Sequence, residues 1–209
     1  MKIVVFGATG GTGIEIVKQA LESGHEVTAF VRNPAKMTLQ HAKLSVVRGD
    51  VSDVAAVDQA VKGQEAVVSA LGPSRPPVAG MMESAARNIV AAMQRNGVRR
   101  LVSTTGAGVR DPQDRPKLAD HVMKALLTLL AGEVLRDSAA NVAVLRESGL
   151  DWTIVRFPRL VEGPRTGKYR VGLIGKDSGV QLSRADGADF VLRVLAAGSH
   201  LHEMPVASY

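Results

Sequence analysis

Glycines and threonines near the N-terminus are the residues whose types and spacing have the clearest chemical meaning. The stretch "FGATGGTG", residues 6–13, follows the apolar run "KIVV" and spaces its glycines as G-x-x-G-x-x-G. Glycine tolerates positive φ and close backbone approach, and amides at the start of a helix bind phosphate. Tight turns also use glycine, but a strand pattern before and a helix pattern after favour a dinucleotide pyrophosphate. The residues expected to hold it are Gly7, Thr9, Gly10, Gly11, Thr12 and Gly13.

Basic residues follow the second apolar run, in "VRNPAK". Arg32 and Lys36 stand where an acidic residue would favour NAD and a basic one favours the 2′-phosphate of NADP. An arginine can bind phosphate through two hydrogen bonds. We therefore predict that NADP(H) is preferred over NAD(H), against the alternative that both are solvated loop charges. Arg75 is either a second phosphate contact or a solvated arginine.

An acidic residue ends the third apolar run. Asp50, in "GDVSD", has the position to accept a hydrogen bond from the adenine amino group. It can equally cap the helix that follows, and the two roles do not exclude each other.

The elements that position these residues alternate between strand and helix patterns. Strands are expected at residues 2–6, 26–31, 44–50, 65–71, 99–105, 151–157 and 203–207. Helical spacing of apolar residues follows most of them, Ser52-Asp53 and Ser183 are candidate caps, and a long helical region at 118–148 is expected to break near Gly132. Repeated strand–helix units predict an α/β fold of the Rossmann type: a doubly wound, mostly parallel sheet with helices on both faces.

The ligand edge of such a sheet lies beyond the carboxyl ends of its strands. We expect one domain over residues 1–209, with small substrate-side loops at about 72–80, 106–118 and 158–182. The 118–148 region is expected to cover the core, with a pocket lid, a dimer contact or a partner contact as alternatives.

Composition narrows the class of protein. The 209 residues are 45% hydrophobic and 22% charged, which is typical of a globular chain, and there is no cysteine for a disulfide or thiolate site. The net charge of +6 comes with only 3% aromatic residues and no basic run, so we expect no nucleic acid partner. The longest apolar stretch, residues 125–132, is too short to span a membrane. The glycine loop comes too early to leave room for a signal peptide, so a cytoplasmic location is expected. The five histidines show no metal-site spacing, and no metal is expected.

Several motifs in register resemble the atypical short-chain dehydrogenase/reductase superfamily. The segments "FGATGGTG", "VRN", "GDV", "GQEAVVSALG", "ARNIVAAM", "GVRRLVSTT", "VLRESGLDWTIVR" and "GPRTGKYRV" keep the order of its NAD(P)H-binding group that includes NADPH-dependent flavin reductase, also called biliverdin-IXβ reductase. The resemblance covers nearly the whole chain.

The resemblance implies roles for further residues. Asp50 and Val51 would line the adenine, and Leu71 and Gly72 the ribose side. Thr104 and Thr105 would lie near the nicotinamide, and Pro158 to Leu160 would close its pocket. Arg159 stands where the flavin-reductase relatives have a histidine. The catalytic residue stays open, with Thr104, Thr105 and Arg159 as candidates.

One departure from the wider superfamily concerns the proton donor. The usual Tyr-x-x-x-Lys pair is missing, because Tyr169 and Tyr209 lack a lysine four residues later, and the matching places fall near Val134 and Ser138. Reduction of isolated ketones is therefore disfavoured, whereas hydride transfer to a delocalised acceptor needs no such donor. We predict an NADPH-dependent flavin- or quinone-type reductase that acts on a small-molecule electron acceptor, free flavin included, as a monomer or homodimer. The alternative is a non-catalytic NAD(P)H sensor of the NmrA-like type.

Overall fold

The computed structural model describes residues 1–74 and 76–209, without the side chains of residues 119, 120, 123, 124, 126, 127 and 130. The strands are β1 (Lys2–Phe6), β2 (Glu26–Val31), β3 (Leu44–Arg48), β4 (Ala66–Ser69), β5 (Arg100–Gly106), β6 (Asp151–Phe157), β7 (Arg159–Val161), β8 (Arg170–Gly172), β9 (Gln181–Ser183) and β10 (Val206–Ser208). The helices are α1 (Gly11–Glu22), the 3₁₀ turn η1 (Pro34–Lys36), α2 (Val54–Val61), α3 (Met81–Arg95), α4 (Leu118–Arg146) and α5 (Arg184–Ala197).

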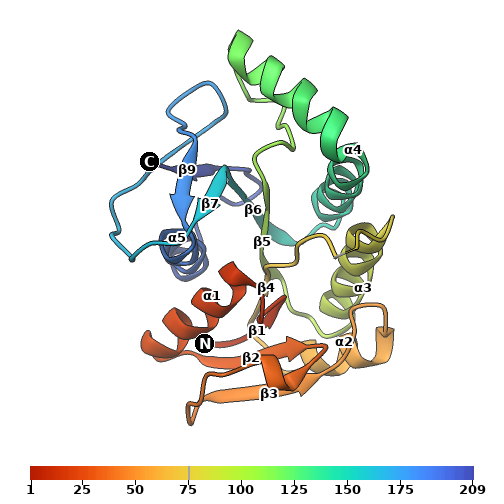
Figure 1. The fold of residues 1–209 in the computed structure, drawn as a ribbon. Coiled ribbons are helices and arrows are strands. Elements are labelled where there is room, and N and C mark those ends of the chain that lie inside the picture. Colours follow the sequence, from red (N-terminus) through yellow and green to blue (C-terminus); the bar gives the residue numbers. More distant parts are fainter. Residues whose placement is uncertain (75) are drawn as a thin grey trace.

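The main sheet has the strand order β3-β2-β1-β4-β5-β6-β10-β8 (Figure 1). Its pairs are parallel except for β8, which runs antiparallel to β10 at one edge. The chain leaves β1 for β2 and β3 on one side and returns beside β1 with β4, so the order reverses next to β1. The predicted Rossmann-type fold is confirmed, and the reversal puts the glycine-rich loop at the point where such sheets bind ligands.

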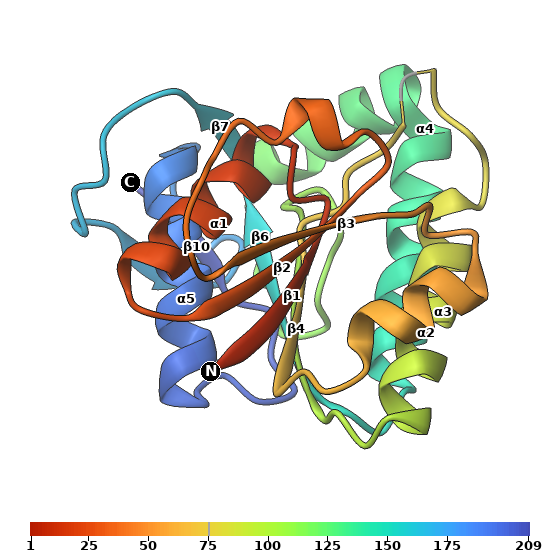
Figure 2. The same cartoon turned by 90° about the horizontal axis from the view of Figure 1, so that it is seen from below.

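Two hydrophobic cores fill the spaces above and below the sheet. Figures 1 and 2 agree that α1 and α5 lie on one face and that α2, α3 and α4 lie on the other. The first core gathers Ile3 and Val5 of β1 with Ile16 of α1 and Val191 of α5. The second gathers alternate residues of the same strands with α2, α3 and the second half of α4. Strand side chains alternate between faces, so one apolar strand serves both cores.

The segment expected as a loop at 158–182 contains regular structure. β7 and β9 form a separate two-stranded parallel sheet, with Arg159 opposite Gln181 and Val161 opposite Ser183. β8 also arises from this segment and joins the main sheet. The last strand is β10 at Val206–Ser208 instead of residues 203–207, and β3 ends at Arg48 instead of Asp50.

The long helix α4 is interrupted at the place expected from the sequence. Ala131, next to Gly132, has φ −147° and ψ 36°, which separates an N-terminal half from a C-terminal half. Asn141, Val142 and Leu145 of the C-terminal half are buried, whereas Leu118 and Leu129 of the other half are exposed. In Figure 1 the N-terminal half stands clear of the other helices.

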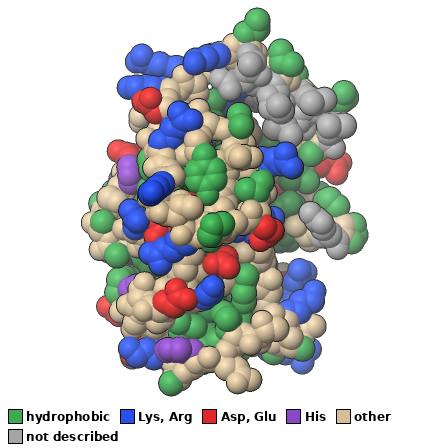
Figure 3. All heavy atoms as spheres, turned by 60° about the vertical axis from the view of Figure 1, so that its left-hand side comes forward, with side chains coloured by type: hydrophobic (Ala, Val, Ile, Leu, Met, Phe, Trp, Pro, Cys, Tyr) green, Lys and Arg blue, Asp and Glu red, His purple; other side chains and the backbone are tan. Residues whose placement is uncertain are grey.

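The charged surface is mixed on the face that carries α5, β7 and β9. Figure 3 shows Lys and Arg side chains there scattered among acidic and apolar ones. The net positive charge is therefore not gathered into one stripe on this face. Among the described residues, α4 included, no helix has the length and apolar character needed to cross a bilayer.

Candidate functional site

Glycine is required at two positions of the loop between β1 and α1. Gly7 has φ +76°, and a Cβ there would lie 2.5 Å from the carbonyl oxygen of Ala70. A Cβ at Gly13 would overlap the carbonyl of Gly7 itself. The Gly10 amide also donates to the Gly7 carbonyl at 2.9 Å. The loop is thus folded tightly against β4, which leaves Gly10 and Gly11 exposed at the carboxyl edge of the sheet.

The start of α1 differs from the starts of α2, α3 and α5. Asp53 caps α2 through the amides of Ala55 and Ala56, and Ser183 caps α5 through the amide of Asp186. In α3 the cap comes from α4, because the Asp137 carboxylate accepts from the amides of two first-turn residues at 3.0 and 3.1 Å.

At α1 no carboxylate or hydroxyl of the described residues closes the end in this way. Gly10 is the N-cap and makes no side-chain hydrogen bond, and the first turn holds no acidic residue. Free amides and the positive end of the helix dipole together favour an anion. This loop therefore fits the pyrophosphate of a dinucleotide, with the half-buried Thr9 and Thr12 as further hydroxyl donors.

The predicted 2′-phosphate residues lie at the same edge. Arg32 follows β2 directly and is exposed, and the exposed Lys36 ends η1, which Asn33 caps through the amide of Ala35 at 3.1 Å. Arg75 lies outside the described residues. The guanidinium of Arg32 and the ammonium group of Lys36 are therefore accessible to a phosphate beyond the end of β2.

Asp50 is not the cap of α2. Its Oδ1 accepts from the Ser52 amide at 2.9 Å and from the Ser52 hydroxyl at 2.7 Å, while Asp53 does the capping. These two bonds, with a contribution from Arg32, hold the pKa of Asp50 below its ordinary value. An exposed carboxylate that is held ionised beside Arg32 remains suited to accept from an adenine amino group.

The neighbouring adenosine-side residues are positioned by α3. Asn88 donates to the carbonyl of Val51 at 2.8 Å, and both Val51 and Leu71 are half-buried against the second core. Gly72 follows Leu71 and is exposed, and a Cβ added there would meet no atom within 4 Å. A ligand therefore meets open space at Gly72 and an apolar wall beside it.

The predicted nicotinamide-side residues divide between the two faces of the sheet. Thr104 is buried and lies on the α1 and α5 face with Val102, whereas the half-buried Thr105 lies on the α4 face with Leu101. Pro158 and Leu160 are half-buried, and Arg159 is exposed at the start of β7. All lie at the carboxyl ends of β5 and β6, but the two threonine side chains approach that edge from opposite sides.

A buried ion pair, which was not predicted, holds the loop after β5. Arg156 of β6 is fully buried, and its Nη1 and Nη2 donate to Asp114 at 2.6 and 2.9 Å. Asp114 also accepts from the amides of Asp111 and Ile174, while Arg156 Nε donates to the Met204 carbonyl at 2.7 Å. Burial raises the pKa of Asp114, but the hydrogen bonds from Arg156 and the amides outweigh it and lower that pKa.

Two carboxylates on α5 hold the segment 158–182. Asp186 accepts from Thr166 and Gly167 and from the Tyr209 hydroxyl at 2.7 Å. Asp189 accepts from the Tyr169 hydroxyl at 2.6 Å and pairs with an arginine of the segment. Burial and the neighbouring Asp189 raise the pKa of Tyr169. The sequence signal that could have identified them is a pair of aspartates, three residues apart, among the mostly apolar and buried residues of α5.

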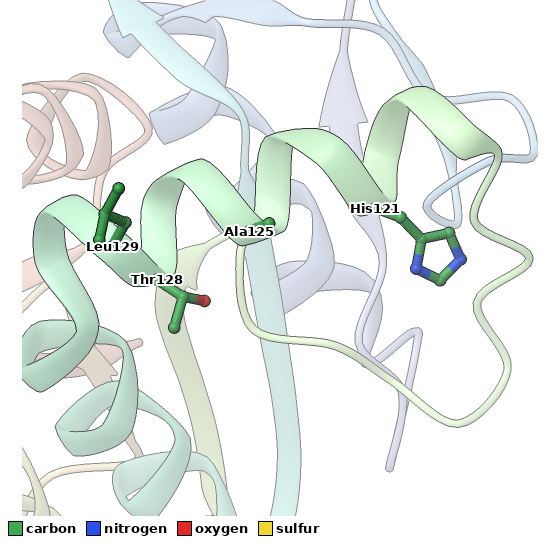
Figure 4. A pocket seen from close by; sticks show the side chains of 4 residues that line it. All are labelled: His121, Ala125, Thr128 and Leu129. Carbon is green, nitrogen blue, oxygen red and sulfur yellow. The ribbon is translucent and has the colours of Figure 1, made fainter.

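A pocket of about 620 Å³ lies along the N-terminal half of α4. Figure 4 shows that its lining side chains, His121, Ala125, Thr128 and Leu129, come from that one helix. None of the predicted cofactor residues that the structure describes lines it. Among the described residues no group of three or more His, Cys, Asp or Glu side chains could hold a metal ion.

Comparison with known proteins decides the family. Residues 7–197 match the profile of a family described as NAD(P)H-binding. The chain belongs to this NAD(P)H-binding family. Its resemblance to the atypical short-chain dehydrogenase/reductases is confirmed, and the description of the family supports NAD(P)H binding by this chain.

Relatives of this NAD(P)H-binding protein extend over nearly its full length. An uncharacterized Bacillus subtilis protein, YwnB, is 31% identical over 96% of this chain and 93% of its own. Escherichia coli O157:H7 ChuY, described as an anaerobillin reductase, shares the fold with a TM-score of 0.81 at 21% identity, over 100% and 97% of the two chains. A Veillonella parvula short-chain dehydrogenase/reductase in complex with NADP has a TM-score of 0.80 at 21% identity, over 100% and 94%.

Proposed function

We propose that this chain is an NADPH-dependent oxidoreductase that transfers hydride to a flavin, a quinone or a similar conjugated acceptor. Family membership supports NAD(P)H binding. Arg32 and Lys36 beyond β2 support the choice of NADPH. The description of ChuY as a reductase and the NADP complex of the Veillonella protein are in line with this choice.

The observation that carries the proposal is that both tyrosine hydroxyls are engaged by carboxylates of α5. Tyr169 donates to Asp189 and so holds the segment 158–182 to α5, while Tyr209 donates to Asp186 and so holds the residue after β10 to the same helix. Tyr169 is followed four residues later by Leu173 and not by a lysine. A ketone reductase needs a donor for the developing alkoxide, whereas a reduced flavin or hydroquinone anion is stabilised by delocalisation and takes its proton from water.

Each part of the edge then has a role in binding. The glycine loop holds the pyrophosphate, Arg32 and Lys36 hold the 2′-phosphate, and Asp50 accepts from the adenine. Thr104, Thr105, Pro158, Arg159 and Leu160 surround the nicotinamide. When bound, NADPH supplies the hydride with its two electrons and leaves as NADP⁺. The chain's own contribution is to hold donor and acceptor face to face.

The N-terminal half of α4 provides a wall for the acceptor. It follows the loop after β5, so it begins at the carboxyl edge of the sheet, and its pocket is lined mainly by apolar atoms of Ala125, Thr128 and Leu129. A planar conjugated ring matches such a surface.

An acceptor panel tests this function. Purified protein should oxidise NADPH in the presence of FMN, riboflavin or menadione, followed by the loss of nicotinamide absorbance, and should oxidise NADH more slowly. For the arginine variants described below, the matched control is Arg99→Met, which removes one positive charge at the opposite edge of the sheet. Tight NADPH binding with no turnover of any acceptor would overturn the enzyme and favour a nucleotide sensor.

A further inference from the structure

An arginine that the sequence motifs did not single out lies directly over the glycine-rich loop. Arg184 is the first residue of α5, and its side chain packs on Gly11, the first residue of α1. A Cβ at Gly11 would overlap Arg184 Nε and would lie 2.9 Å from its Cδ. The absence of a side chain at Gly11 is what allows the arginine to lie there.

The position of Arg184 is fixed by the backbone on both sides. Ser183 caps α5 and pairs with Val161 across the β7–β9 sheet, so α5 begins at a defined point. Farther along α1, Gln19 donates to the carbonyl of Ala185, the residue after Arg184, at 2.9 Å. The backbone of Arg184 is therefore held in place, and its side chain extends from there to the start of α1.

Its present partner is a weak one. Glu162 follows Val161 of β7 and is placed next to Arg184 by the register of the two short strands. The Nη1–Oε1 distance is 3.3 Å, and the Glu162 side chain is 87% exposed. Ion pairs of this kind contribute little in water. A guanidinium beside the positive end of α1 is itself unfavourable until an anion joins both.

We infer that Arg184 is a pyrophosphate-binding residue whose guanidinium is exchanged between Glu162 in the free protein and the dinucleotide in the complex. The pyrophosphate offers several anionic oxygens to a two-pronged donor, whereas Glu162 offers one long contact. Because Glu162 adjoins β7, which also carries Arg159 and Leu160, the exchange links nucleotide binding to the segment that closes the nicotinamide side. The inference rests on the dinucleotide binding of the proposed function, and it does not depend on turnover.

The test is direct binding of NADPH, NADH and ADP-ribose by calorimetry to wild type, Arg184→Met and Glu162→Gln. Arg184→Met should weaken all three ligands by the same factor, about 10- to 100-fold for loss of a charge-assisted hydrogen bond. Glu162→Gln should tighten all three by up to about fivefold, since it removes a competitor of surface strength. In the double variant this gain should disappear, because Glu162 acts through Arg184. Arg184→Lys should restore only part of the affinity.

Controls separate a binding role from a structural one. The unfolding midpoint of Arg184→Met without nucleotide should match wild type, because Ser183 still caps α5. Arg99→Met should bind all three ligands as wild type does.

Three results would overturn the inference: unchanged binding by Arg184→Met, a loss confined to NADPH, or a Glu162→Gln gain that survives in the double variant. The acceptor panel is read separately. If wild-type protein binds NADPH but reduces no acceptor, the proposed reductase activity is rejected. The proposed role of Arg184 in binding the pyrophosphate is not affected by that result.

Discussion

Arg156 and Asp114 form a two-pronged ion pair beneath the carboxyl edge of the sheet, with the Arg156 side chain fully buried and the Asp114 side chain 3% exposed. Through the Ile174 amide and the Met204 carbonyl, this pair joins β6, the loop after β5, the turn after β8 and the stretch before β10. The loop that leads into α4 is therefore tied to the sheet by charge as well as by backbone.

Asp114→Asn should destabilise the protein by about 3–5 kcal/mol, because it leaves the guanidinium of Arg156 buried without its counter-charge. Urea unfolding measures this change. Asp58→Asn is the matched control, since Asp58 pairs with Arg95 on the surface and should cost no more than about 1 kcal/mol. Equal losses in the two variants would contradict the importance of the buried pair.

The same pair predicts a pH dependence. The pKa of Asp114 is lower in the folded protein than in the unfolded chain, so its contribution is present above about pH 4. That stabilisation is lost as the pH falls through the folded pKa. The difference in unfolding free energy between wild type and Asp114→Asn should therefore shrink on acidification, and a constant difference from about pH 7 to about pH 2 would refute the assignment.

Arg32→Met should weaken NADPH by about 10- to 100-fold and leave NADH nearly unchanged, because only NADPH carries the phosphate that the guanidinium would bind. Binding titrations with both nucleotides measure the ratio. A parallel loss for NADPH and NADH would show that Arg32 does not distinguish them. This pattern differs from that of Arg184→Met, which should affect both nucleotides alike.

Gly7→Ala should be severely destabilising, since alanine would be strained at φ +76° and its Cβ would lie 2.5 Å from the Ala70 carbonyl oxygen. We expect a loss of several kcal/mol, about the size of other strained or overpacked sites, and loss of NADPH binding. Thermal unfolding measures the first effect. Gly72→Ala is the control for stability, because nothing lies within 4 Å of the added carbon. A Gly7→Ala protein as stable as Gly72→Ala would mean that the loop is not packed as described.

Tyr169→Phe and Tyr209→Phe should keep NADPH oxidation within about threefold of wild type, because a proton-donating tyrosine would be worth about 10²- to 10⁴-fold. Both should lose some stability, since each removes a hydrogen bond to a buried aspartate. Steady-state rates corrected for folded protein check this. A hundredfold drop in either variant would identify that tyrosine as the missing proton donor.

The main sheet was predictable because each central strand is an apolar run and the helices α1, α2 and α3 each have a clear apolar face. The short strands β7, β8 and β9 were not, because three residues show no period and pairing with a distant segment decides their structure. The family motifs located the glycine loop, and the chain order of strands predicted that Arg32 and Asp50 share its edge.

The contacts that Arg156 and Arg184 make could not be predicted from the sequence, for a different reason. Arg156 stands within the strand "DWTIVRF", and its carboxylate partner lies 42 residues earlier in a loop. Arg184 meets Gly11 only because α5 packs across α1. Such contacts depend on the packing of whole elements, and neither residue type nor local spacing marks them in a single sequence.

The interruption at Ala131 divides α4 into two pieces with different structural roles. The second piece belongs to the core through buried residues such as Val142, and its Asp137 closes the start of α3. The first piece exposes Leu118 and Leu129, and in the proposed function it provides the wall for the acceptor. If the proposed function holds, exchanging residues 118–130 for those of a relative should redirect the choice of acceptor while the nucleotide half of the protein is left intact.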